Sequence, residues 1–234
     1  MSVSSLNPKP RGLDLFSGAG GASMGYHLAG FEMTGVDIVK QPRYPFDFVQ
    51  ADALEYLAEH GTEFDFIAAS PPCQAYSITK HSHSKEHPEL IEPTRELLQA
   101  TGLPYVMENV VGAPMATVVE LCGASFGLTA TDLDGMPLVL RRHRLFESNV
   151  MLMQQPCECR DFKAKGFRVG GVYGGGPSNR DKSWKRGGYT PPASVRAELM
   201  GIDWMTQKEL TQAIPPAFTR WIGEQLIASL EQVA

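Results

Sequence analysis

Cysteine is scarce in this sequence, with four residues among 234 and no regular spacing between them. This spacing excludes a disulfide framework and favours a reducing, cytoplasmic setting. Long apolar runs are also missing, and Met1–Pro8 lacks the charged and apolar regions of a signal peptide. We therefore expect no membrane partner. The length of 234 residues suits one sizeable α/β domain.

Basic residues are scarce outside one segment. The chain carries a net charge of −5, but residues 141–190 carry +7, against −10 for residues 1–140 and −2 for residues 191–234. An acidic body with one basic segment is typical of a protein that binds a polyanion on one face. The alternative is a solvated loop region whose charge is incidental.

A complete G-x-G-x-x-G motif is absent, yet a glycine-rich turn follows the first expected strand. That strand is predicted at residues 11–16, and Ser17–Ser23 leads from it into a helix. Asp37 ends the next expected strand, 19 residues after Gly18, where an acidic side chain binds ribose hydroxyls in nucleoside-binding βαβ units. The turn contains no basic residue that could pair with a pyrophosphate, so a nucleoside cofactor without phosphates fits better than NAD.

Polar residues also follow the other expected strands. Asp52 either caps the next helix or contacts the base of a nucleoside. Cys73 comes after an apolar run, residues 64–69, that two prolines end. It is either a small buried hydrophobe or a reactive thiol in a ligand crevice. Glu108 ends another strand and is a candidate acid, the alternative being a capping or salt-bridging role.

A further strand is expected within Met136–Phe146. Side chains on a strand alternate between its faces, so Arg142 and Arg144 would lie on the same side. Two neighbouring arginines favour an anionic or carbonyl-rich group opposite them.

Six stretches of the sequence carry a family resemblance. In chain order they are Asp14–Gly21, Pro71–Gln74, Glu108–Val110, Arg142–Arg144, Ser194–Ile202 and Gln212–Pro216. They resemble the ordered motifs of DNA cytosine-5 methyltransferases, and the resemblance covers nearly the whole chain apart from about 147–190. The sequence departs from the family where Ser70 replaces a glycine, Leu140 a glutamine and Gln212–Ala213 a Gly-Asn pair.

The resemblance implies a compact member with a Rossmann-like S-adenosylmethionine-dependent methyltransferase fold, in which helices cover both faces of a mostly parallel sheet. We expect a catalytic and cofactor-binding domain at 1–146, a small target recognition segment at 147–190 and a C-terminal return at 191–234. The last helix, about 216–231, should pack beside the first motif. The implied protein is a monomer that acts on double-stranded DNA in a bacterial or phage setting, as in restriction-modification.

The resemblance also implies a reaction. A methyl group would pass from S-adenosylmethionine to C5 of a flipped-out cytosine, through a covalent bond between Cys73 and C6. Glu108 would contact N3 and the exocyclic amine, and Arg144, supported by Arg142, would stabilise the O2 side. An RNA cytosine-5 methyltransferase and a catalytically silent nucleic-acid-binding homologue remain alternatives.

Two further sets of residues follow from the resemblance and from the basic segment. The cofactor would be bound by Phe16, Ser17, Gly18, Gly20, Asp37, Ile38, Asp52, Ala53 and Pro71. Nucleic acid would be contacted by Gln74, Ser77, Arg180, Lys182, Lys185 and Arg186. Within the first set, Asp37 is assigned to the ribose and Asp52 to the adenine.

No metal is expected. The three histidines of Ser77–His87 have no cysteine or acidic partner at ligand spacing, which favours a lid over a metal site. Cys157 and Cys159 lack a second pair at finger spacing, and Cys122 lies far away in the sequence.

Overall fold

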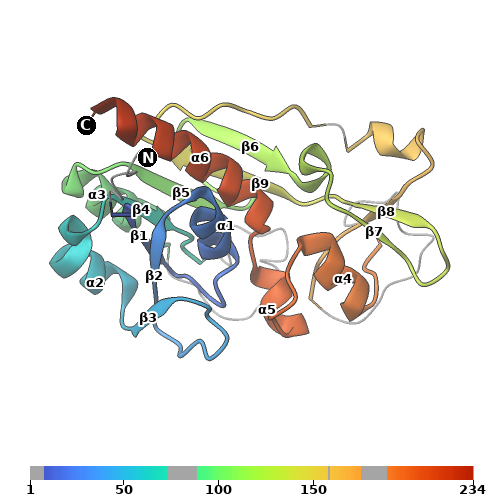
Figure 1. Cartoon of the computed structure of the whole chain (residues 1–234), viewed down its shortest axis with the longest axis horizontal. Helices are drawn as coiled ribbons and strands as arrows, with labels where there is room; N and C mark the ends of the chain where they lie inside the picture. The colour runs from blue at the N-terminus through green and yellow to red at the C-terminus, as the bar shows by residue number, and fades with distance from the viewer. Residues whose placement is uncertain (1–7, 73–88, 158, 175–188, 234) are drawn as a thin grey trace, which may run out of the picture.

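The computed structural model describes residues 8–72, 89–157, 159–174 and 189–233 (Figure 1). Two sheets and six α-helices are built from these residues. None of the helices in the described ranges is both long and apolar enough to cross a membrane.

Seven strands form the main sheet. Their bounds are β1 Arg11–Leu15, β2 Glu32–Asp37, β3 Asp47–Gln50, β4 Phe66–Ala69, β5 Tyr105–Asn109, β6 Val118–Cys122 and β9 His143–Ser148. They lie in the order β3-β2-β1-β4-β5-β9-β6. The first five run parallel, whereas β9 is antiparallel to both of its neighbours. The prediction of an α/β fold with a mostly parallel sheet is therefore confirmed.

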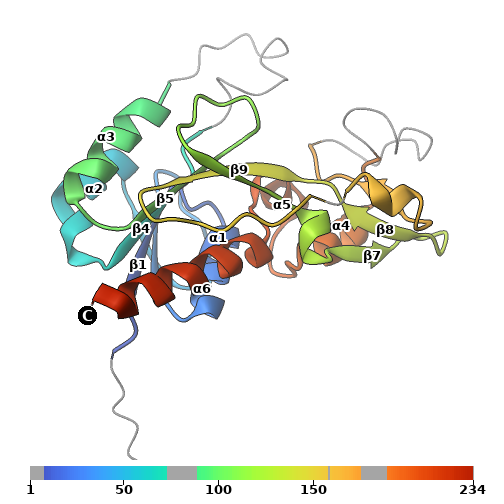
Figure 2. The same ribbon diagram turned by 90° about the horizontal axis from the view of Figure 1, so that it is seen from above.

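Helices cover both faces of the main sheet (Figure 2). They are α1 Gly21–Ala29, α2 Ala53–His60, α3 Ile91–Thr101 and α6 Pro216–Val233. Leu57 and Leu98 bring α2 and α3 into one buried apolar cluster with the sheet, and Tyr26 and Phe218 bring α1 and α6 into another. Each amphipathic helix thus buries one apolar stripe against the sheet. The last helix packs along α1, as predicted.

Strand β1 marks the point where the connections change direction. Its neighbours are β2 on one side and β4 on the other, and all three run parallel. The loops that follow β1 and β4 therefore diverge, and they leave a crevice at the carboxyl ends of these strands. Open α/β sheets bind their ligands at such a crevice.

The small sheet lies at the far end of the molecule from α2 and α3 (Figure 1). Its strands are β7 Thr129–Thr131, β8 Pro137–Leu140 and β10 Arg168–Gly170, in the order β10-β8-β7. Two helices follow it, α4 Ala193–Met200 and α5 Gln207–Gln212. Leu138 of β8 and Leu199 of α4 are fully buried in a shared core, so this sheet has an apolar cluster of its own.

The junction between the two sheets differs from the sequence-based expectation. A single strand within Met136–Phe146 was expected, but β8 ends at Leu140 in the small sheet and β9 begins at His143 in the main sheet. Arg142 lies between them, so the alternation of side chains along one strand does not relate it to Arg144. The expected domain boundary at residue 146 falls inside β9, and β7 and β8, which precede it, belong to the small sheet.

Candidate active site

A cavity of about 760 Å³ opens at the carboxyl ends of the parallel strands, where the crevice beside β1 lies. Its volume is in the range of small-molecule sites, about 300–1,000 Å³. Ten of the residues predicted from the sequence line it: Phe16, Ser17, Gly18, Asp37, Ile38, Asp52, Ala53, Pro71, Glu108 and Arg144. The fold thus brings together residues that are far apart in the chain.

The turn after β1 has a tight backbone path. Phe16 adopts φ 57°, which is rare for a residue with a side chain, and Gly18 adopts φ 49°. A Cβ on Gly18 would meet no atom within 4 Å, so the backbone here is open to the cavity. Gly20, with φ 83°, caps α1 and does not line the cavity. Its contribution is to the path of the turn.

Two carboxylates stand on the wall of the cavity. Asp37 accepts the backbone N–H of Gly18 at 3.0 Å through Oδ2, and that of Val39 at 2.9 Å through Oδ1. These bonds hold the glycine-rich turn against the end of β2. Asp52 accepts the N–H groups of Leu54 and Glu55 through Oδ1, at 2.9 and 3.2 Å. The capping interpretation of Asp52 is confirmed, and its place on the cavity wall is compatible with a ligand contact as well.

An ion pair also lines the cavity. Nε of Arg144, on β9, lies 2.8 Å from Oε1 of Glu108, on the neighbouring strand β5. Glu108 is only 9% exposed, and burial raises the pKa of its carboxyl group. The positive charges of Arg144 and Arg142 oppose this rise, as does a hydrogen bond from Ser70. The carboxyl group of Glu108 is therefore protonated more readily than that of an exposed glutamate.

Asn109, the residue after Glu108, fixes the Pro71–Pro72 segment, which precedes Cys73 in the sequence. The side-chain amide of Asn109 donates a hydrogen bond to the carbonyl of Pro71 at 3.0 Å, and Asn109 is fully buried. This bond holds the Pro71–Pro72 end next to the ion pair. Seven predicted residues lie outside the described ranges: Cys73, Gln74, Ser77, Arg180, Lys182, Lys185 and Arg186.

Arg142 does not stand beside Arg144 in the cavity, contrary to the expectation from the sequence. Its guanidinium group is buried and donates to three carbonyl oxygens, those of Val172 at 2.8 Å, Thr211 at 3.0 Å and Ala213 at 2.9 Å. These contacts tie the junction between the sheets to the segment that follows α5. Arg142 is therefore a positioning residue, which fixes the chain just before Arg144.

Sequence reasoning missed the segment around α5 as a wall of the cavity. Met205, Thr206, Lys208, Glu209 and Thr211–Ile214 all line it. Trp204 holds this segment by donating from its indole N–H to the carbonyl of Ala19 at 2.9 Å, and Glu209 pairs with Arg43 at 3.1 Å. Of this segment, only the residues from Gln212 onward belong to one of the recognised motifs. No sequence pattern marked residues 205–211 as part of a ligand site.

Asp14, on β1, is a second residue that the sequence did not single out. It lines the cavity and is almost fully buried, and Ser23 donates its hydroxyl hydrogen to it. The pKa of Asp14 is raised to about 7, mainly by burial and to a smaller extent by the negative charges of Asp37 and Glu108, while hydrogen bonds from Ser23 oppose the rise. The motif that contains Asp14 was recognised, but its burial depends on the fold.

Two buried polar atoms on this wall indicate where a polar ligand fits. Oδ1 of Asp14 and Oγ of Ser17 have no hydrogen-bond partner among the described residues. A buried polar group without a partner costs about 1–3 kcal/mol, so a ligand that supplies one is favoured. Together with the carboxylates of Asp37 and Asp52, these atoms suit a ligand that carries hydroxyl and amine groups. The residues present therefore fit a nucleoside cofactor.

Comparison with known proteins gives three findings at the sequence level. Residues 11–113 match the model of the family C-5 cytosine-specific DNA methylase. The chain is 36% identical over 142 residues to the type II methyltransferase M.HindV of Haemophilus influenzae, covering 52% of this chain and 46% of that protein. It is 30% identical over 122 residues to the type II methyltransferase M.XorII of Xanthomonas oryzae, covering 44% and 29%. The chain thus spans less than half the length of these relatives.

Solved structures with the same fold cover nearly the whole chain. A protein encoded within a prophage of E. coli has a TM-score of 0.59 at 16% identity, covering 95% of this chain and 99% of that one. The Dnmt2 methyltransferase of S. pombe has a TM-score of 0.58 at 13% identity, covering 97% and 99%. At this level of identity the likeness shows the fold.

Proposed function

We propose that this chain, whose residues 11–113 belong to the C-5 cytosine-specific DNA methylase family, transfers a methyl group from S-adenosylmethionine to C5 of cytosine in DNA. The observation that carries the proposal is the Glu108–Arg144 ion pair on the cavity wall, next to the Pro71–Pro72 end. The type II relatives favour a modification enzyme of a restriction-modification pair.

The glycine-rich end of the cavity would hold the cofactor. The carboxylate of Asp37 would accept hydrogen bonds from the ribose hydroxyls, and Asp52 would accept one from the adenine amine. The open backbone at Gly18 would let the methionine part approach closely. When bound, S-adenosylmethionine supplies an electrophilic methyl group.

Cys73 would activate the cytosine. C5 is a poor nucleophile, so the Cys73 thiolate attacks C6, and the electrons of the C5–C6 double bond move to C5. Carbon 5 would then take the methyl group as its bond to the cofactor's sulfur breaks, which leaves S-adenosylhomocysteine as the second product. Loss of the C5 proton to a base restores the double bond and expels the thiolate. The described residues support this role because Cys73 follows directly on Pro72, which lines the cavity.

Glu108 and Arg144 would stabilise the ring during attack. Negative charge that builds on the ring is relieved by a proton or hydrogen bond at N3, and burial favours the protonated form of Glu108 that can supply it. Arg144 would stabilise the O2 side and orient Glu108 through their ion pair. Arg142 would act through Arg144, by fixing the backbone that precedes it.

The substrate would be double-stranded DNA, from which the target base must leave the stack to reach the cavity. The basic segment at residues 141–190, with a net charge of +7, would supply the phosphate contacts of a monomeric enzyme. Within it, Arg180, Lys182, Lys185 and Arg186 are the predicted contacts. Gln74 and Ser77 are predicted to contact the nucleotide beside Cys73.

The test is transfer of labelled methyl from S-adenosylmethionine to duplex DNA, with the same assay run on RNA. We expect label on C5 of cytosine in DNA, no label with Cys73→Ser, and transfer about 10²–10⁴-fold slower with Glu108→Gln. Duplex DNA with 5-fluorocytosine should give a complex with the wild type that survives denaturant, because fluorine cannot leave C5 as a cation. Cys73→Ser should not form it.

Calorimetric binding of the cofactor separates the alternatives. Cys73→Ser should bind S-adenosylmethionine as the wild type does, since the proposed role of the thiol is to attack the base and not to bind the cofactor. Label on RNA alone would replace the proposal with an RNA methyltransferase. Cofactor binding without label on either nucleic acid would indicate a catalytically silent binding protein.

A further inference from the structure

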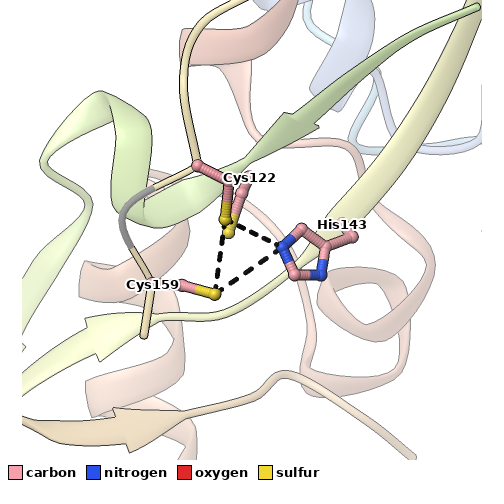
Figure 3. A group of neighbouring side chains, drawn as sticks. Cys122, His143 and Cys159 are labelled. Carbon is pink, nitrogen blue, oxygen red and sulfur yellow. Dashed lines mark hydrogen bonds between the residues drawn. The ribbon is translucent and has the colours of Figure 1, made fainter. Parts of the chain in front are cut away.

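Three cysteines and a histidine meet where the main sheet adjoins the small one. Cys122 ends β6 and His143 begins β9, and the two are directly opposite each other across the strands. Cys157 and Cys159 come from the segment that follows β9. The side chains of Cys122, His143 and Cys159 point toward one another (Figure 3). All four possible ligand atoms lie within 4.8 Å of one another.

The distances in this cluster suit a tetrahedral metal ion. Nε2 of His143 lies 3.3 Å from Sγ of Cys157 and 3.7 Å from Sγ of Cys159, and the two sulfur atoms are 3.4 Å apart. Zinc has Zn–S bonds of about 2.3 Å and Zn–N bonds of about 2.0–2.1 Å, which place the ligand atoms of a tetrahedron about 3.5–3.8 Å apart. Small adjustments of these three contacts, together with an approach of the Cys122 sulfur, which lies within 4.8 Å of the other ligand atoms, therefore complete the geometry.

The thiols are available as ligands. Cys122, Cys157 and Cys159 are all free cysteines.

The surroundings fit a closed structural site. Cys122 and Cys159 are buried in an apolar cluster with Val139 and Val169, which excludes water from one side. Three thiolates around a divalent ion leave a net charge of −1, and the nearby cations Arg141 and Arg160 offset it. A set of three cysteines and one histidine is a usual donor set of structural zinc sites, and it leaves no open position for a substrate.

We propose that Cys122, His143, Cys157 and Cys159 bind a structural zinc ion. The ion joins the ends of β6 and β9 to the segment that leads into the small sheet. His143 directly precedes Arg144, so the same site fixes the start of the strand that carries the ion pair with Glu108. The expectation of no metal rested on the absence of a second cysteine pair at finger spacing. Here the two remaining ligands come from paired strand ends instead.

The first test is the metal content and thiol count of the full chain. Protein purified from zinc-supplemented cells should contain close to one zinc ion per chain by mass spectrometry. The cluster accounts for three of the four cysteines in the sequence, and Cys73 is the fourth. A thiol reagent should therefore titrate one thiol in the native protein, and four after a chelator and denaturant are added. Replacement of zinc by cobalt(II) should give the charge-transfer and strong visible bands of tetrahedral thiolate coordination.

Matched serine variants identify the ligands. Cys159→Ser should lose most of the zinc and the thiolate bands of cobalt, whereas Cys73→Ser should keep both while its native thiol count falls to zero. If Cys159→Ser does not fold, the stoichiometry, thiol count and cobalt spectrum of the wild type still decide the question. Zinc far below one per chain, together with four reactive thiols in the native protein, would overturn the proposal. A cobalt spectrum without thiolate bands would overturn it as well.

Discussion

The two ends of the main sheet are assembled in different ways. At the parallel end, two carboxylates that line the cavity are held within single β-α units: Asp52 caps the helix that it begins, and Asp37 binds the turn 19 residues before it. At the antiparallel end, the decisive contacts join segments far apart in the chain. Arg142 reaches carbonyl groups of Val172, Thr211 and Ala213.

This difference teaches where a single residue matters most. A turn held by local backbone bonds forms whenever its own strand and helix form. A junction held by one buried guanidinium group loses three hydrogen bonds when that group is removed, because three carbonyl groups depend on the same donor. The parallel end should therefore tolerate substitution of single polar anchors better than the junction between the sheets does.

The largest effect on stability is expected for Arg142→Ala. It removes three hydrogen bonds from a charged group, each worth about 1.5–3 kcal/mol, and leaves their acceptors buried. Since such bonds are not additive, we expect a loss of about 3–5 kcal/mol in the free energy of unfolding, measured by urea denaturation. The free energy of unfolding of Arg142→Lys should lie between those of the wild type and Arg142→Ala, because one ammonium group cannot reach all three carbonyls.

Asp52→Ala is the matched substitution at the parallel end. It removes an N-cap that accepts two backbone N–H groups, and such a loss costs about 0.5–2 kcal/mol. Equal losses in the free energy of unfolding for Arg142→Ala and Asp52→Ala would contradict the inference that the junction depends more strongly on a single polar residue.

An effect close in size to that of Arg142→Ala, but dependent on pH, is expected from Asp14 at the parallel end, because it arises from the burial of a charge and not from a local hydrogen bond. Its pKa is about 7 in the folded protein against an ordinary value of 3.8. Between these two pH values the folded state binds more protons than the unfolded chain, so stability falls as pH rises from about 4 to about 7. A shift of three units corresponds to about 4 kcal/mol, fully lost above pH 7.

Asp14→Asn keeps an acceptor for Ser23 and removes the titration. Urea denaturation at pH 5 and at pH 8 should show a smaller decrease in stability for this variant than for the wild type. Burial also raises the pKa of Glu108, so Glu108→Gln serves as a parallel control that removes the other contribution of the same sign. Identical pH dependence in wild type and Asp14→Asn would show that Asp14 titrates normally.

The parallel end was largely predictable from the sequence. Its strands are short apolar runs that glycine or proline ends, and the loops that follow carry the functional residues, so local patterns suffice. The turn after β1, Asp37 at the end of β2 and Glu108 on β5 were all placed in this way. The N-cap role of Asp52 was an alternative from the start, since capping is also a local interaction.

The small sheet and its junction with the antiparallel end of the main sheet were not predictable in the same way. β7 and β10 have three residues each, too few for a periodic signal. The change of sheet next to Arg142 depends on which strands find each other, and no residue pattern marks it. The approach of Cys122 to Cys159 and the place of α5 at the cavity likewise result from tertiary packing. These features depend on contacts between distant segments, which one sequence alone does not reveal.

A long-range contact between two helices, α1 and α6, gives one of the smaller expected effects. Gly25 of α1 lies against the first turns of α6, and a Cβ there would fall 2.0 Å from Oγ1 of Thr219 and 2.2 Å from the carbonyl oxygen of Pro216. Thr219 also donates to the carbonyl of Ala22 at 2.8 Å, so the two helices cannot separate without losing this bond. The close approach therefore requires glycine.

Gly25→Ala should gain about 1 kcal/mol in helix propensity and lose about 1–3 kcal/mol through overpacking. Because the clash involves backbone as well as a side chain, we expect the second effect to exceed the first, with a net loss of about 1–2 kcal/mol in the free energy of unfolding. Leu28→Ala on the exposed side of the same helix is the control, and should stay within about 0.5 kcal/mol of the wild type. A stabilised Gly25→Ala would mean that α6 moves freely on α1. The packing of α6 on α1 would then stabilise the fold less than the hydrogen bonds of Asp37 do.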